Sequence, residues 1–207
     1  MVRTPKNLVK RPAGIILAGG ESRRMGRDKA SLAWGDSNIL HRQLTVLASV
    51  CDELIVVSNA PRDICYPAVR IVSDCYTGCG PLGGLEAGLA AAQAEVCFVV
   101  ACDMPFLDAG SVSYISQAAN GFDAAVPMAG NRWHPLYAAY QTACLPAIRS
   151  QLKAGRLRMS ELLSTVRVRT VAAAELVPFN PDLHMLQNAN TPDEWKRIFS
   201  LYEKPNS

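Results

Sequence analysis

Short apolar runs recur along the first two thirds of the chain, and segments with helical spacing separate them. A strand covered on both faces is apolar throughout, whereas a half-exposed strand alternates polar and apolar residues. Such strands alternating with helices are typical of an α/β fold, a mostly parallel sheet with helices on both faces. The expected strands are residues 14–18, 54–58, 69–72, 96–101 and 124–127.

Leucine spacing predicts the helices between these strands. Leu40, Leu44, Leu47 and Cys51 follow one another at steps of four, three and four residues, which places them on one helix face. A second helix, with Leu85 on its apolar face, starts after a run of glycines and a proline. Beyond residue 130 the pattern loosens, and we expect a helix near 142–153, a strand near 167–171 and a last helix opened by Thr191, Pro192, Asp193 and Glu194.

Length and composition predict one domain with a substantial core, since 49% of the 207 residues are hydrophobic. We expect this domain over residues 13–204 and a flexible basic tail over residues 1–12. The tail holds four of the 21 basic residues, and without it 17 basic residues face 18 acidic ones, a net charge of −1. A body without excess positive charge predicts no nucleic-acid partner.

No apolar run is long enough to cross a bilayer, and residues 1–12 lack the apolar core of a secretion signal. We therefore expect no membrane association and a cytoplasmic location. The seven cysteines are scattered and odd in number, which favours reduced thiols over a disulfide framework.

A glycine-rich loop with several cations follows the first expected strand. Glycines let the backbone approach a polyanion and turn N–H groups toward it, and Arg and Lys side chains neutralise its charge. The Walker and dinucleotide-binding spacings are both missing. The pattern predicts a loop that binds a nucleoside triphosphate, and the structural alternative is a plain tight turn. The residues concerned are Leu17, Ala18, Gly19, Gly20, Ser22, Arg23, Arg24 and Lys29.

Polar side chains follow the next three expected strands at the point where each ends. Asn59 follows the second strand, Asp74 the third and Asp103 the fourth. Ligands of open α/β sheets bind outside the carboxyl ends of the strands. We therefore expect these side chains and the glycine-rich loop to converge on one site.

Asp103, Lys29 and Arg24 are the expected catalytic residues. A carboxylate directly after a buried strand can hold Mg²⁺ that bridges triphosphate oxygens, and the alternative is an Asp that caps the next turn. Lys29, assisted by Arg24, would neutralise phosphate charge, unless it is only a solvated lysine at a helix start. No covalent nucleophile is needed, because the phosphate of an acceptor can itself attack the α-phosphorus.

Five segments together resemble the molybdenum cofactor guanylyltransferases, the MobA-like nucleotidyltransferases. The first is L-A-G-G-x-S-x-R-M-G-x-D-K at residues 17–29, and the resemblance extends from Gly14 to about Trp195. It implies a three-layer Rossmann-like nucleotidyltransferase fold. It also implies Mg²⁺-dependent transfer of GMP from GTP to the terminal phosphate of molybdopterin, which forms a guanine dinucleotide cofactor and releases pyrophosphate. The other segments are Asp74 with Gly80–Gly84, Cys102–Pro105, His134–Leu136 and Asn188–Pro192.

The resemblance implies a role for each part of the site. Asp74 would accept hydrogen bonds from ribose or base, and the turn before the second helix would lie along the purine edge, unless it is simply a tight helix start. Beyond the loop, the GTP-binding residues would be Asn59, Asp74, Asp103, Gly80, Pro81, Leu82 and Gly83. The acceptor-binding residues would be His134, Pro135, Asn188 and Asn190, for which packing or capping roles are the alternative.

Two other functions stay open. The first is cytidylyl transfer to the same cofactor, but those relatives carry Ala-Ala-Gly in place of Ala18-Gly19-Gly20 and a Gly-Asp-Gln-Pro-like motif in place of residues 102–105. The second is a non-catalytic nucleotide-binding carrier, which we would expect to lack Lys29, Arg24 or Asp103. Besides the two substrates, the expected partners are molybdenum insertion proteins or molybdoenzymes in transient contact.

Overall fold

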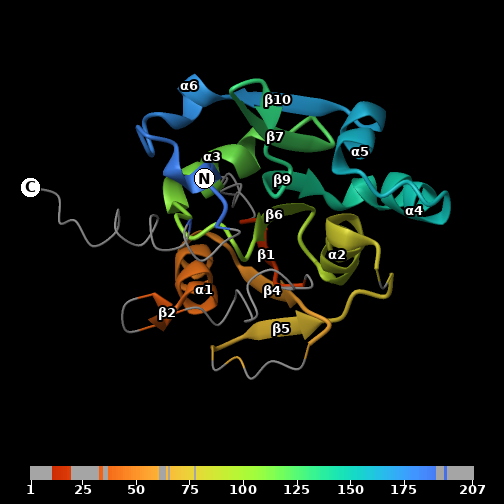
Figure 1. Cartoon of the computed structure of the whole chain (residues 1–207), viewed down its shortest axis with the longest axis horizontal. Coiled ribbons are helices and arrows are strands. Elements are labelled where there is room, and N and C mark those ends of the chain that lie inside the picture. Colours follow the sequence, from red (N-terminus) through yellow and green to blue (C-terminus); the bar gives the residue numbers. More distant parts are fainter. Residues whose placement is uncertain are drawn as a thin grey trace, which may run out of the picture.

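A twisted sheet forms the middle layer of the protein (Figure 1). The computed structural model describes residues 11–19, 33–34, 37–60, 64, 66–76, 78–189 and 194. Within these residues the sheet has eight strands in the order β10-β7-β9-β6-β1-β4-β5, with β8 paired to β7. The strands are β1 (Ala13–Leu17), β4 (Glu53–Val57), β5 (Val69–Val72), β6 (Val96–Ala101), β7 (Ala124–Ala129), β8 (Arg132–Trp133), β9 (Tyr137–Gln141) and β10 (Val168–Ala172).

Helices cover both faces of this sheet. The apolar side chains of α1 and α3 pack on one face, and those of α2, α4 and α5 pack on the other. Asn38 and Asp108 start α1 and α3, because each side chain accepts a hydrogen bond from a backbone N–H in the first turn. The helices are α1 (Ile39–Val50), α2 (Gly80–Ala91), α3 (Ala109–Ala118), α4 (Leu145–Lys153), α5 (Met159–Thr165) and α6 (Ala173–Leu176), with β2 (Ala33–Trp34) and β3 (Ser37–Asn38) forming a separate ribbon.

The expected α/β fold with a mostly parallel sheet is confirmed. β1 pairs in parallel with β4 on one side and β6 on the other, and the parallel pairs β4–β5 and β7–β10 extend the sheet. The five strands expected before residue 130 and the strand expected near 167–171 are all present, and their ends lie within two residues of the expected ones. The looser region after residue 130 holds a strand that the periodicity did not reveal: β9, which runs antiparallel between β6 and β7.

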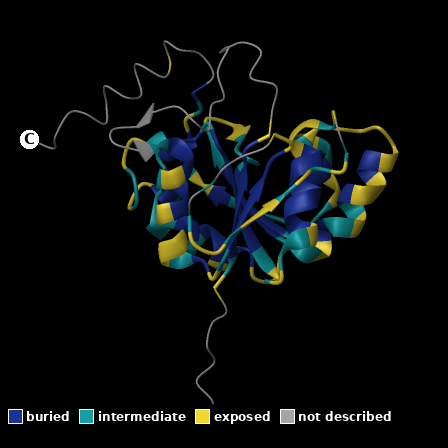
Figure 2. Cartoon of the chain, turned by 90° about the horizontal axis from the view of Figure 1, so that it is seen from below, coloured by how far each residue is buried: buried dark blue, intermediate teal, exposed yellow. Residues whose placement is uncertain are grey.

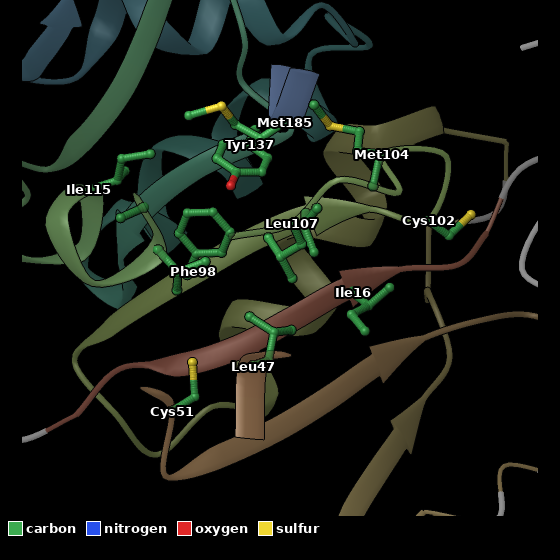
Figure 3. Close-up of a cluster of buried hydrophobic side chains, with 14 of the residues drawn as sticks. Ile16, Leu47, Cys51, Phe98, Cys102, Met104, Leu107, Ile115, Tyr137 and Met185 are labelled. Carbon is green, nitrogen blue, oxygen red and sulfur yellow. The ribbon is translucent and has the colours of Figure 1, made fainter. Parts of the chain in front are cut away.

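The core lies in two layers, one on each side of the sheet (Figure 2). Alternate residues of a strand point to opposite faces, so Ile16 joins the layer under α1 and Ile15 joins the layer under α2. Figure 3 shows the first layer, in which Leu47 of α1, Phe98 of β6 and Tyr137 of β9 are fully buried. Cys97 and Cys102 are buried. Burial raises the pKa of the Cys97 thiol to about 12.

Two expectations concern the ends of the chain, which the structure describes only in part. Most of the N-terminal tail and most of the helix expected from Thr191 lie outside the described residues. In the part of the chain that is described, no helix is both long and apolar enough to cross a membrane.

Candidate active site

The candidate site lies where the ends of β1 and β6 meet. From β1 the chain proceeds to β4 and β5 on one side, and then returns to β6 on the other side of β1. The crevice at such a reversal is where open α/β sheets bind ligands. Leu17, the last residue of β1, is in register with Ala101, the last residue of β6, and the Cys102 N–H donates to the Leu17 oxygen at 3.1 Å. The glycine-rich loop and the Asp103 segment therefore leave the sheet side by side.

The first residues of the loop lie where they were expected. Leu17 and Ala18 are buried, and the Ala18 N–H donates to the oxygen of Val57, the last residue of β4, at 2.9 Å. Gly19 is exposed, and a Cβ added to it would meet no described atom within 4 Å. The backbone of Gly19 is therefore open to a ligand at the carboxyl edge of the sheet.

Asp103 lies in a tight turn directly after β6. The turn is closed by the Met104 N–H, which donates to the Ala101 oxygen at 3.2 Å. A segment from far along the chain holds Asp103 from a second direction: Asn188 Nδ2 donates to Asp103 Oδ1 at 3.1 Å, and the Ala189 N–H donates to the Asp103 backbone oxygen at 2.9 Å. Two predicted site residues 85 positions apart are thus in direct contact.

The donor chemistry of Asp103 fits a divalent cation. A carboxylate is a hard oxygen ligand, and Mg²⁺ is commonly held by one or two carboxylates together with substrate phosphates and water. Within the described residues no cluster of three or more His, Cys, Asp or Glu side chains could form a complete metal cage. A single carboxylate such as that of Asp103 can share such a cation with a bound triphosphate.

Asn59 and Asp74 form a second part of the site, after β4 and β5. Pairing continues past these strands, since the Ser58 N–H donates to the Val72 oxygen at 2.9 Å. Asn59 Oδ1 then accepts from the Asp74 N–H at 2.7 Å, and Asp74 Oδ1 accepts from the Tyr76 N–H at 2.7 Å. Burial raises the pKa of the Asp74 carboxyl, against the effect of the Tyr76 N–H, and nearby Glu86 raises it further.

Helix α2 begins beside Asp74 and supplies the other predicted nucleoside-binding residues. Gly80, its first residue, has φ +61°, a conformation that glycine adopts without strain, and Pro81 follows in the first turn. Gly83 lies under the Asp74 carboxylate, since a Cβ at this position would be 2.6 Å from Asp74 Oδ2. Glycine at residue 83 therefore lets Asp74 lie against the helix. Leu82 is fully buried against the sheet, so its side chain belongs to the core.

The predicted acceptor residues His134 and Pro135 reach the same edge because β9 is antiparallel. The segment before β9 lies where β6 ends, and the Ala101 N–H donates to the Leu136 oxygen at 3.0 Å. His134 is half-buried, and its N–H donates to the Pro127 oxygen at 2.9 Å. Burial lowers the pKa of the His134 imidazole, and the positive charge of Arg132 lowers it further.

The remaining predicted site residues cannot be placed. Gly20, Ser22, Arg23, Arg24, Lys29 and Asn190 lie outside the described residues. The described site residues form two groups. One group lies around the end of β6 and consists of Asp103, Asn188 and residues 134–136. The other lies beyond the end of β4 and consists of Asn59, Asp74 and the start of α2. The contact between Asn188 and Asp103 was missed by the sequence analysis, which assigned the two residues to different substrates.

Comparisons with known proteins give one consistent result. A family model described as "MobA-like NTP transferase domain" matches residues 14–169. The chain is 36% identical over 181 residues to a "Probable molybdenum cofactor guanylyltransferase" of Pelotomaculum thermopropionicum, covering 87% of this chain and 88% of that protein. It is 35% identical over 186 residues to a "Molybdenum cofactor guanylyltransferase" of Desulfosudis oleivorans, covering 89% and 92%.

Solved structures show the same fold. Molybdopterin-guanine dinucleotide biosynthesis protein A from Archaeoglobus fulgidus superposes with a TM-score of 0.80 at 24% identity, covering 93% of this chain and 100% of that one. A Mycobacterium tuberculosis protein whose structure was solved in complex with manganese superposes with a TM-score of 0.58 at 16% identity, covering 92% and 99%.

Proposed function

The chain belongs to the MobA-like NTP transferase family, and from this we propose that it transfers GMP from GTP to the terminal phosphate of molybdopterin. The product is a guanine dinucleotide form of the molybdenum cofactor. The observation that carries the proposal is the convergence of Asp103, Asn188 and the His134 segment on the carboxyl end of β6, next to the end of β1. Relatives at 35–36% identity with guanylyltransferase names support guanine as the base.

The reaction needs no covalent enzyme intermediate. An oxygen of the acceptor phosphate attacks the α-phosphorus of GTP, the bond from that phosphorus to the bridging oxygen breaks, and pyrophosphate leaves with the electron pair. The protein has to align two anions and reduce their repulsion. We assign the screening of phosphate charge to Lys29 and Arg24, and phosphate contacts to the loop from Leu17 through Gly20, Ser22 and Arg23.

We propose Mg²⁺ as the cofactor, held by Asp103. A divalent cation supplies charge stabilisation on the phosphate oxygens. Asp103 would offer its carboxylate from a turn fixed on β6, and Asn188 would keep that carboxylate oriented through its 3.1 Å hydrogen bond. The manganese complex of a protein with the same fold supports a divalent cation.

The guanosine end of GTP would lie over the start of α2. Asp74 presents a half-buried carboxylate that can accept from ribose hydroxyls or from the base, and Asn59 fixes its backbone. The exposed turn at Gly80 and Pro81 would follow the purine edge, with Gly83 leaving room for Asp74. We assign four residues to the acceptor site. His134, Pro135 and Asn188 are among the described residues, and Asn190 lies outside them.

Pyrophosphate release tests the proposal directly. The enzyme is mixed with each of the four nucleoside triphosphates and Mg²⁺, with and without molybdopterin. We expect release with GTP, and only when molybdopterin is present. Comparable catalytic efficiency with CTP would contradict the guanine assignment and leave nucleotidyl transfer intact, whereas no release with any nucleotide would contradict the activity itself.

A further inference from the structure

A buried glutamine of α1 lies beneath the turn that carries Asp103. Gln43 is fully buried, and it lies on the same apolar face of α1 as Leu40, Leu44 and Leu47. Its Nε2 donates to the Ala101 oxygen and to the Met104 oxygen, both at 2.9 Å. The side chain therefore spans the turn from its first to its last residue, over separations of 58 and 61 positions in the chain.

The amide nitrogen explains why an apolar face contains this polar residue. A single NH₂ group has two hydrogens, and here each goes to one of the two carbonyl oxygens. The Oε1 atom is buried and has no partner among the described residues, so Gln43 incurs a desolvation cost that an apolar residue would avoid. The two carbonyls also fix which way the amide of Gln43 faces. If Oε1 and Nε2 were exchanged, Oε1 would lie against the oxygens of Ala101 and Met104 with no hydrogen between them.

We propose that Gln43 is a positioning residue for the metal-binding carboxylate. It acts through the backbone: by tying Ala101 to Met104, it fixes the turn between them and with it the direction of the Asp103 side chain. Asn188 and Ala189 hold Asp103 from the opposite end of the chain. This inference rests on the proposed function, in which Asp103 binds the divalent cation.

The test measures how much a divalent cation strengthens nucleotide binding. A non-hydrolysable GTP analogue is titrated calorimetrically into the enzyme with and without Mn²⁺, and the ratio of the two affinities is compared between variants. Gln43→Met removes both donors and keeps a side chain of similar length. We expect it to reduce the ratio by roughly tenfold, as is typical when a group that orients a metal ligand is lost, and to leave the metal-free affinity unchanged.

Gln151→Met is the matched control. Gln151 is 2% exposed on α4, which packs on the opposite face of the sheet, and its Nε2 also donates to a backbone oxygen, that of Arg158, at 2.9 Å. We expect this variant to lower the melting temperature without changing the ratio. If Gln43→Met is poorly folded, Gln43→Asn, whose amide is one methylene shorter, should fold and still reduce the ratio.

Asp103→Asn separates the inference from the function on which it rests. If Asp103→Asn reduces the ratio and neither Gln43 variant does, Gln43 has no positioning role and the metal assignment stands. A ratio unchanged by Asp103→Asn would overturn the metal assignment and the inference together. Equal reductions in Gln43→Met and Gln151→Met would overturn the inference by showing a general effect of destabilisation.

Discussion

At the level of single residues, Asp103 is expected to have the largest effect on catalysis. Its carboxylate is held by the turn after β6 and by Asn188, so we expect it to act as a preorganised electrostatic group. Removing one such group commonly costs about two to three orders of magnitude in turnover. We expect this loss for Asp103→Asn, measured as kcat at saturating GTP, molybdopterin and Mg²⁺. Near-normal turnover would exclude Asp103 from the reaction.

His134 gives a prediction about pH. Burial and the charge of Arg132 lower its pKa below the ordinary value of 6.5, so the folded protein holds the imidazole neutral. On acidification the unfolded chain takes up this proton first, and the contribution of His134 to stability is therefore lost as the pH falls below about 6.5. In its proposed role at the acceptor site, a neutral imidazole would contact the anionic acceptor through a hydrogen bond at neutral pH.

NMR titration of the imidazole checks whether the pKa of His134 is lowered. We expect the His134 resonance to titrate below pH 6.5, and Arg132→Gln to move the midpoint upward because one repulsive charge is gone. Lys153→Gln, which removes an exposed cation from α4 on the other face of the sheet, should leave the midpoint where it was. A midpoint that does not respond to Arg132→Gln would contradict the electrostatic coupling.

At the level of elements, α2 lies close to the sheet because glycines face its neighbours. A Cβ at Gly83 would be 2.6 Å from Asp74 Oδ2, and a Cβ at Gly88 would be 2.7 Å from Ile15 Cγ2. Asp74 cannot move without weakening its hydrogen bond to the Tyr76 N–H. We therefore expect Gly83→Ala to raise the KM for GTP by roughly tenfold, the equivalent of one charged hydrogen bond.

Gly88→Ala is the control for that substitution. It makes the same change in the same helix, and it presses on Ile15 of β1 and Val57 of β4, away from the predicted nucleoside contacts. Both variants should have lower melting temperatures, because the added methyl group presses on Asp74 in one and on Ile15 in the other. An equal rise of the KM for GTP in the two variants would show that the displaced helix, rather than Asp74, determines nucleotide affinity.

For the protein as a whole, one ionic cluster ties the edge of the sheet to two helices. Glu175 of α6 accepts from Tyr114 of α3 at 2.6 Å, pairs with Arg169 of β10 at 2.5 Å and accepts from the Ala172 N–H at 2.7 Å. The hydrogen bonds from Arg169 and Tyr114 lower the pKa of the Glu175 carboxyl to about 2. Its contribution to stability is present above about pH 4.5 and is lost as the pH falls through about 2.

Glu175→Gln should therefore lower the free energy of unfolding at neutral pH by about 1–2 kcal/mol, a modest value because the side chain is 25% exposed. Urea titrations at pH 7 and at acidic pH measure the difference, which should shrink as the pH approaches 2. Glu95→Gln, at an exposed position before β6, should have little effect. If the difference in the free energy of unfolding between Glu175→Gln and the unmodified protein stays constant down to about pH 2, the stabilisation by Glu175 is not ionic.

The local pattern of the sequence was sufficient for the six expected strands, the buried face of α1 and the polar residues at the strand ends. Apolar runs such as 96–101 are dictated by burial on both faces, and a residue that follows such a run must lie at the sheet edge. Asp103, Asp74 and Asn59 could therefore be placed from the sequence. The roles of His134, Asn188 and Asn190 came from family resemblance, because a lone His or Asn has no local pattern that distinguishes ligand contact from packing.

The pairings across the chain could not be derived from local periodicity. The antiparallel entry of β9 beside β6 brings His134 to the site, and Asn188 reaches Asp103 across 85 positions. Gln43 gave one overlooked signal, a polar residue on the apolar face of Leu40, Leu44 and Leu47. The spacing of apolar residues shows which face of a helix or strand is buried. The partner of a buried polar group depends on how distant segments of the chain pack together. The reason is that a hydrogen bond requires two atoms to be close in space, whatever their separation in the sequence.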